Sequence, residues 1–212
     1  MSERAPIAII DAGIGNLRSV QKAFEFLGVT PQITHDPEAV LRADAVVLPG
    51  VGAFGDGMQG LQQHGMDEAI RQAIQNGRPF LGICVGLQLL FEESEEMGWH
   101  RGLGIFPGRI VRFPRSLTVP HMGWNQLHQR RAHPLLADVP DGAFVYFAHS
   151  YHAVTNDETI VIATTDYGED FPSVVAKDNV WAVQFHPEKS HRVGLTILRN
   201  FLEYLGDHLS RD

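Results

Sequence analysis

Short apolar runs alternate with helical periods over the first half of the chain, and this alternation limits the possible folds more than any other feature. Each apolar run predicts a buried strand, and each following period of apolar residues predicts a helix, the first two of which end at a glycine. The predicted strand and helix of each unit are residues 7–10 with 17–27, 45–48 with 66–76, and 79–83 with 85–91. Such units are joined by parallel crossovers, so we expect an α/β fold with an open, mostly parallel sheet and helices on both faces.

The second half has a different pattern, which predicts an antiparallel β wing on this sheet. A turn at residues 177–179 leads into a strand over 180–185, and apolar residues at helical spacing from Val193 to Leu205 predict a final helix. The other β-rich pieces are residues 109–113, 144–148, 159–165 and 173–176. Because no linker, repeat or low-complexity segment interrupts the chain, we predict a single domain over residues 1–212.

Composition and charge argue against several classes of function. The net charge of −8 opposes binding to nucleic acid, whose phosphates dominate affinity. The longest nearly apolar stretch, residues 80–91, is too short to span a membrane, and residues 1–10 lack a secretory signal, so we expect a cytoplasmic protein. The single cysteine, Cys84, cannot form an intramolecular disulfide, and no spacing of metal ligands is present.

Two glycine-rich loops do not predict a nucleotide cofactor. In the first, Gly13-Ile14-Gly15, the third glycine of a dinucleotide-binding loop would fall at Arg18. The second, residues 50–55, lacks the Gly-Lys-Ser/Thr ending of a phosphate-binding loop. We therefore expect no bound cofactor.

The segment Gly82-Ile83-Cys84-Val85-Gly86 has the spacing of a nucleophile elbow, with cysteine at the position of the nucleophile. Glycines two positions to either side let the backbone turn sharply from a strand into a helix. The positive N-terminal end of that helix favours a thiolate. The segment also fits a buried structural cysteine between two packing glycines, so this motif alone leaves both interpretations open.

A base and a carboxylate for such a cysteine occur in Phe185-His186-Pro187-Glu188. Residues two apart in an extended segment face the same side, so Glu188 can hold the imidazole of His186. A cysteine nucleophile needs a pair of this kind. Taken alone, a histidine beside a proline at a strand end is more often an ordinary loop residue.

Together these motifs resemble the class I (triad) glutamine amidotransferases. The resemblance extends from about Ile7 to Leu205. The residues that carry it are the Cys84 elbow, Gln88, residues 49–52 (PGVG) and residues 185–190 (FHPEKS). Within the family, residues 49–58, 121–125 and 146–151 look like the glutaminase subunit of imidazole glycerol phosphate synthase, an enzyme of histidine biosynthesis.

The resemblance implies a reaction and a role for each residue of the triad. Cys84 attacks the side-chain carboxamide of glutamine, His186 protonates the leaving ammonia, and Glu188 orients His186. A glutamyl thioester forms, and water then releases glutamate. The amide of Val85 and the Gly50-Val51 peptide are the expected donors to the oxyanion.

The resemblance also implies a set of residues that bind glutamine: Gly50, Gly52, Gln88, Glu96, His149, Ser150 and Tyr151. Gln88 lies one helical turn after Cys84 and on the same face, although an ordinary exposed glutamine fits the sequence too. Glu96 lies in a crowded acidic run, for which a solvated surface is the more common explanation. Residues 121–125 fit either the core or an interface.

A second polypeptide must accept the ammonia, because the recognised motifs of this chain are all used for hydrolysing glutamine. By resemblance, this partner is a (β/α)8-barrel cyclase that forms a heterodimer with the chain. It makes imidazole glycerol phosphate and AICAR from PRFAR, a phosphoribulosyl formimino ribonucleotide. The expected interface residues are Asn16, Trp124, Tyr146 and Lys189.

Three other functions remain compatible with the sequence. The chain could be the glutaminase of another synthase, such as pyridoxal phosphate synthase, or a stand-alone γ-glutamyl cysteine hydrolase or peptidase. It could also be a silent binding subunit, which the complete triad disfavours.

Overall fold

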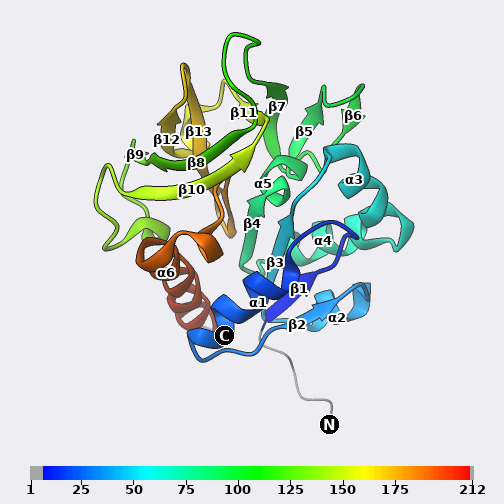
Figure 1. Cartoon of the computed structure of the whole chain (residues 1–212). Helices are drawn as coiled ribbons and strands as arrows, with labels where there is room; N and C mark the ends of the chain where they lie inside the picture. The colour runs from blue at the N-terminus through cyan, green and yellow to red at the C-terminus, as the bar shows by residue number, and fades with distance from the viewer. Residues whose placement is uncertain (1–6, 211–212) are drawn as a thin grey trace.

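A sheet of eight strands crosses the computed structural model, which describes residues 7–210 (Figure 1). The strands, in spatial order, are β2 (Gln32–Thr34), β1 (Ile7–Ile10), β3 (Ala45–Gly50), β4 (Phe80–Cys84), β14 (Val180–Val183), β13 (Asp170–Lys177), β12 (Val161–Asp166) and β9 (His128–Gln129). The first five are parallel, and β13, β12 and β9 continue the sheet in antiparallel pairing. The predicted absence of a signal in residues 1–6, and both ends of the predicted domain, lie outside the described residues.

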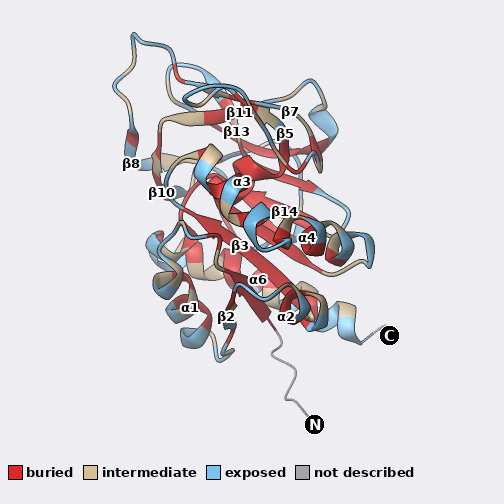
Figure 2. Ribbon diagram, turned by 90° about the vertical axis from the view of Figure 1, so that its right-hand side faces the viewer, coloured by how far each residue is buried: buried red, intermediate tan, exposed pale blue. Residues whose placement is uncertain are grey.

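Helices cover both faces of the parallel strands, which confirms the predicted fold class. On one face, α1 (Leu17–Phe26) contacts α6 (His191–Leu209). The opposite face carries α2 (Pro37–Arg42), α3 (Phe54–Gln63) and α4 (Met66–Gln75). The short helix α5 (Val85–Leu89) directly follows β4. Figure 2 shows the strands between these layers as buried, and the outer faces of the helices as exposed.

Two smaller sheets complete the antiparallel wing. One is a ribbon of β8 (His121–Gln126) and β10 (Phe144–His149). The other contains β11 (Tyr151–Val154), β7 (Phe106–Arg112), β5 (Phe91–Ser94) and β6 (His100–Arg101). Its pairs are antiparallel except for β5 with β7, which is parallel and departs from the predicted antiparallel pattern. The predicted turn at 177–179 joins β13 to β14, with Lys177 paired to Val180. Single-domain organisation stays a prediction.

Several boundaries differ from those predicted. The helix after Cys84 ends at Leu89, because Phe91 is fully buried in strand β5 and pairs there with Phe106. Strand β3 continues past Leu48 to Gly50, which pairs with Cys84. Strand β12 begins only at Val161, after a 3₁₀ turn. The elements not predicted from the sequence are β2, α2, α3, β5, β6, β8, β9 and β11.

No helix within residues 7–210 is both long and apolar enough to cross a membrane.

Candidate active site

Cys84 lies at the predicted junction, as the last residue of β4 and directly before α5. Its backbone has φ 55° and ψ −111°, a conformation that side chains rarely adopt. A Cβ at Gly86 would lie 1.7 Å from the carbonyl oxygen of Leu48, so only glycine lets α5 approach β3 this closely. The strained turn therefore places the thiol at the carboxyl end of the central strands.

His186 and Glu188 are joined by a hydrogen bond of 2.8 Å between Nδ1 and Oε1, and both side chains are almost fully buried. The predicted contact is present, but the predicted geometry is wrong. Glu188 does not lie in an extended segment, because Pro187–Lys189 forms a 3₁₀ turn that brings the carboxylate back to the ring. The turn is held to the ribbon where the amide of His186 donates to the carbonyl of Tyr146 at 2.9 Å.

The other side of the His186 ring faces Cys84, and its Nε2 is buried without a hydrogen-bond partner among the described residues. Burial lowers the pKa of His186, but the interactions with Cys84 and Glu188 outweigh it and raise this pKa to about 10. The three side chains thus form one buried group, in which the imidazole lies between the thiol and the carboxylate. This is the arrangement that a cysteine nucleophile requires.

A cavity of about 260 Å³ opens beside Cys84. The predicted residues that line it are Val51, Gly52, Cys84, Val85, Gln88, Glu96, His149, Ser150 and Tyr151. Gly50 is not among the residues that line the cavity, and its role in binding glutamine stays a prediction. A Cβ at Gly50 would lie 3.0 Å from Cβ of Val85, which indicates that glycine serves close packing at this position.

Gln88 is buried, with 3% of its surface exposed, so the alternative of an ordinary exposed glutamine is wrong. Its Nε2 donates to the carbonyl of Tyr151 at 2.9 Å and to Oε1 of Gln184 at 3.2 Å. Gln184 was missed, although it is fully buried and its Nε2 lies 3.8 Å from Sγ of Cys84. Side-chain alternation along the strand could have found it, because it precedes His186 by two residues.

Glu96 is not part of a solvated acidic surface. Its Oε2 accepts a hydrogen bond of 2.7 Å from the amide of Phe54, the first residue of α3. Burial raises the pKa of Glu96, against the opposing effect of this bond and of His100. The carboxylate therefore lies on the wall of the cavity at a helix N-terminus, where negative charge is stabilised. Pro120, Met122 and Ala148 also line the cavity and were missed.

Val85 is the first residue of α5, and its amide is one of the helical N–H groups that have no acceptor within the helix. Val51 follows β3 and is 37% exposed. Both residues border the cavity beside Cys84. Their positions agree with the two donors that the resemblance implies.

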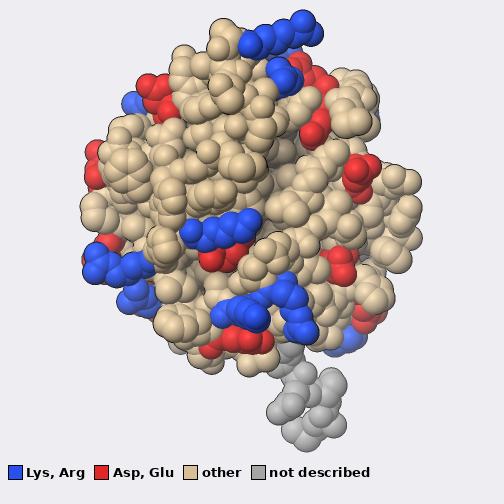
Figure 3. Space-filling view, in the orientation of Figure 1, with Lys and Arg blue, Asp and Glu red and all other residues tan. Residues whose placement is uncertain are grey.

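Three of the four expected interface residues form one cluster at the surface, in which Tyr146 is half-buried. The indole of Trp124 stacks on His191 with ring centroids 5.0 Å apart and meets Tyr146 edge-on at 6.0 Å. Nζ of Lys189 lies 5.9 Å from the centre of the Tyr146 ring. Asn16, the fourth, is exposed and directly precedes α1. In Figure 3, a broad area above the centre of the face shown is uncharged, and basic and acidic side chains are interspersed around it.

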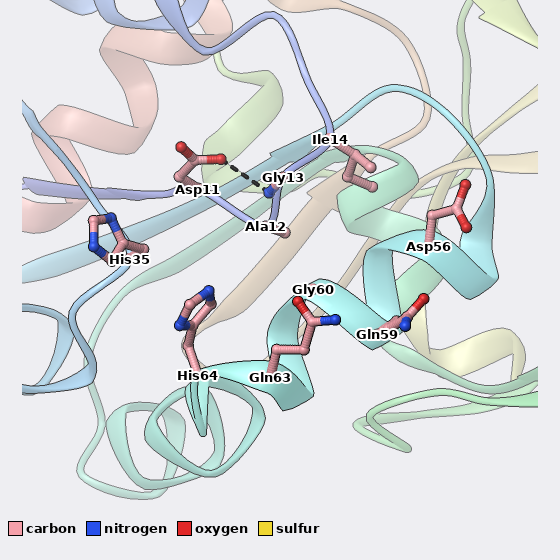
Figure 4. A pocket seen from close by; sticks show the side chains of 10 residues that line it. All are labelled: Asp11, Ala12, Gly13, Ile14, His35, Asp56, Gln59, Gly60, Gln63 and His64. Atoms are coloured by element: carbon pink, nitrogen blue, oxygen red, sulfur yellow. Dashed lines mark hydrogen bonds between the residues drawn. The ribbon is translucent and has the colours of Figure 1, made fainter.

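A larger pocket of about 580 Å³ lies at the ends of β1 and β2, but it contains no residue of the triad (Figure 4). The rings of His35 and His64 face it with centroids 5.7 Å apart, and Asp11 accepts a hydrogen bond from the amide of Gly13. Within residues 7–210, no group of three or more His, Cys, Asp or Glu side chains is placed to hold a metal ion. Size alone does not identify the functional site here.

Known proteins with similar sequences and structures agree on one family. The sequence model of the family described as "Glutamine amidotransferase class-I" matches residues 8–205. "Imidazole glycerol phosphate synthase subunit HisH" of Geobacter metallireducens is 56% identical over 204 residues, covering 93% of this chain and 97% of its own length. The protein of the same name from Salinibacter ruber is 52% identical, covering 91% and 92%.

Solved structures agree on the fold. A crystal structure titled as a glutamine amidotransferase superposes with a TM-score of 0.75 at 21% identity, covering 95% of this chain and 99% of its own. The structure of PurLQS from Thermotoga maritima gives a TM-score of 0.74 at 18% identity, covering 94% and 98%. The sequence match over nearly the whole chain decides the matter: this chain belongs to the class I glutamine amidotransferase family.

Proposed function

We propose that this chain hydrolyses glutamine to glutamate and ammonia as the glutaminase subunit of imidazole glycerol phosphate synthase. Relatives that carry this synthase's name, at 47–56% identity over most of the chain, support this function in histidine biosynthesis. The single observation that carries the chemistry is the buried Cys84, His186 and Glu188 group beside a cavity of about 260 Å³.

The proposed mechanism has one role for each of these residues. The Cys84 thiolate attacks the carboxamide carbon of glutamine, and the amides of Val85 and Val51 bind the oxyanion. The His186 imidazolium gives its proton to the nitrogen, which leaves as ammonia. Glu188 holds the ring through Nδ1. His186, now neutral, takes a proton from the water that cleaves the thioester, and glutamate leaves.

The ammonia passes to a separate cyclase, a (β/α)8 barrel that converts PRFAR into imidazole glycerol phosphate and AICAR. The cluster of Trp124, Tyr146, Lys189 and His191 suits this contact, because aromatic and cationic side chains dominate protein interfaces. Asn16 belongs to the same proposed interface. The expected assembly is a heterodimer.

Cys84→Ala tests whether this chain only produces ammonia and the cyclase carries out the rest of the synthesis. In a complex with the cyclase, this variant should lose glutamine-dependent synthesis and keep synthesis driven by ammonium salt at alkaline pH, since free ammonia replaces the missing step. Product formation from PRFAR measures both activities. Loss of the ammonium-driven reaction in an assembled variant complex would place Cys84 in the cyclase step and contradict the proposal.

A second experiment tests the partnership. We expect the isolated chain to hydrolyse glutamine poorly, and the cyclase with PRFAR to stimulate it, because the glycines at 50 and 52 let the peptide at Val51 rotate and withdraw one oxyanion donor. One such donor is typically worth roughly 2.7 to 4 kcal/mol of activation free energy. An equal kcat for the isolated chain and the PRFAR-bound complex would exclude this gating.

A further inference from the structure

Two buried histidines stand opposite each other in the ribbon of β8 and β10 and are not used by the mechanism. His121 pairs with His149 in the antiparallel register, and their exposed fractions are 4% and 6%. Nδ1 of His121 lies 3.0 Å from Nε2 of His149. Buried imidazoles need partners at both ring nitrogens, and backbone groups define which nitrogen carries each proton here.

The first backbone group is the amide of Gln126, which donates to Oδ1 of Asn125 at 2.8 Å. This bond fixes the orientation of the Asn125 amide, whose Nδ2 donates to the carbonyl of Asp166 at 2.8 Å and lies 3.2 Å from Nε2 of His121. Nε2 of His121 must therefore accept, and Nδ1 must carry the proton. His121 then donates to His149.

The second backbone group is the carbonyl of Tyr151, which can only accept. Nδ1 of His149 lies 2.8 Å from this oxygen and must be the donor. Nε2 of His149 is then free to accept from His121. Asn125 at one end and Tyr151 at the other thus both require that His121 donates to His149. Both rings are therefore neutral Nδ1–H tautomers. Burial supports this assignment, because it lowers the pKa of His121 to about 4 and, with nearby histidines, that of His149 to about 3.

The chain of hydrogen bonds ends on a group that Gln88 also uses. The Tyr151 carbonyl accepts from both His149 and Gln88, and the other N–H of Gln88 is directed to Gln184. With both amide hydrogens used inside the protein, Gln88 has only its carbonyl oxygen for a ligand. That oxygen binds N–H donors, such as the ammonium or carboxamide group of glutamine.

We propose that His121 and His149 are positioning residues for glutamine, which hold the Tyr151 carbonyl and thereby orient Gln88 as an acceptor toward the substrate. The inference rests on the proposed function, because it assumes that glutamine occupies the cavity beside Cys84. Neither histidine takes part in proton transfer. Their loss should therefore weaken glutamine binding more than catalysis.

Steady-state kinetics of the complex with the cyclase and PRFAR test this split. His149→Phe removes the donor to Tyr151 and should raise KM for glutamine about tenfold, with kcat changed less than about threefold, because one hydrogen bond is lost at the pocket. His149→Asn keeps an N–H near the place of Nδ1 and should restore most of the affinity. His133→Phe is the control, since it also removes an imidazole that is partly buried but lies outside this chain of bonds.

A KM unchanged in His149→Phe, or an equal rise in His149→Asn and in the His133→Phe control, would overturn the proposal. Nitrogen-15 NMR of histidines in the chain alone gives an independent measurement, in which both rings should be neutral Nδ1–H tautomers at pH 7. An Nε2–H tautomer at either ring would also overturn it. If the wild-type complex does not hydrolyse glutamine, the proposed function fails, whereas the NMR result still decides the direction of the bonds.

Discussion

Strand β4 and the ribbon of β8 and β10 meet at the cavity beside Cys84, and their backbones are held in place in different ways. Strand β4, which ends at Cys84, is hydrogen-bonded to β3 on one side and β14 on the other, with helices over both faces. The ribbon of β8 and β10 has only its own two strands, and side-chain bonds of Asn125, His121 and His149 supplement its ladder. The nucleophile thus lies on the most constrained backbone, whereas the ribbon wall of the cavity depends more on side-chain hydrogen bonds.

Cys84→Ala should give the largest effect and separate the two regions most clearly. We expect kcat of the complex to fall by about 10⁴-fold or more, because no other group replaces the nucleophile. Glutamine should still bind within about threefold of the wild-type Kd, since the cavity wall from the ribbon is intact. Calorimetric titration and a glutamate assay measure the two quantities. Retained hydrolysis of glutamine would show that Cys84 is not the nucleophile. Loss of glutamine binding would show that the cavity wall from the ribbon does not bind glutamine independently of Cys84.

The next largest effects distinguish the base from the residue that orients it. His186→Ala removes both the acid and the base and should lower kcat about 10³- to 10⁴-fold. Glu188→Gln leaves the ring in place and should cost less, about 10- to 100-fold, and it should lower the pKa of His186 from about 10, since a charge that raises this pKa is removed.

Glutamate assays and NMR titration of His186 provide the measurements for this pair of variants. Glu203→Gln, on the exposed side of α6, is the control for removing a carboxylate. Equal losses in His186→Ala and Glu188→Gln would show that the two residues do not have separate roles.

The difference between the regions also explains what the sequence could predict. The turn from β4 into α5 is determined by residues that are adjacent in the sequence. The glycines spaced around Cys84 predict it, because the backbone must turn sharply there and pack against Leu48. Residues 7–10, 45–48 and 79–83 were predictable as strands because buried parallel strands are continuous apolar runs.

The ribbon and the second small sheet were harder to predict. Strand β8, with the sequence HMGWNQ, has no apolar run, because its inward side chains are stabilised by polar bonds to β10 and to the carbonyl of Asp166. Helix α3 begins Phe-Gly-Asp-Gly, which is typical of a loop, and it is stabilised at its first residue by Glu96 from 42 positions away. Contacts between distant segments decide these elements.

A smaller effect concerns pH and has opposite signs in the two regions. The folded-state pKa values of His121 and His149, about 4 and about 3, lie below the unfolded value of about 6.5, so unfolding takes up protons in acid. Their contribution to stability is present above about pH 6.5 and is lost as pH falls toward 4. The raised pKa of His186 contributes stability below about pH 6.5 that is lost as pH rises toward 10.

Urea unfolding at pH 7 and pH 5 should therefore show a loss of up to about 1.4 kcal/mol per pH unit from each ribbon histidine. Replacing both His121 and His149 with Phe should make the acid slope shallower. His128→Phe, at an exposed position on β9, is the control for replacing a histidine with phenylalanine. An equal slope in the double variant and the wild type would show that the ribbon histidines do not titrate on unfolding.

The smallest expected effect concerns backbone strain at Cys84. It tests whether the turn after β4 is conformationally strained while the backbone of the ribbon is not. At φ 55° and ψ −111°, Cys84 occupies a backbone region that glycine tolerates and side chains do not. Such a residue costs about 1 to 3 kcal/mol, and the greater freedom of glycine in the unfolded chain offsets about 0.4 to 1 kcal/mol of that. Cys84→Gly should thus be about 1 kcal/mol more stable to urea than Cys84→Ala, although both lack the nucleophile.

The control is Ala148→Gly on the ribbon. This change should destabilise the protein, because the backbone of strand β10 has no strain to release. If Cys84→Gly is no more stable than Cys84→Ala, the turn is not strained, and the constraint on the thiol comes from packing alone.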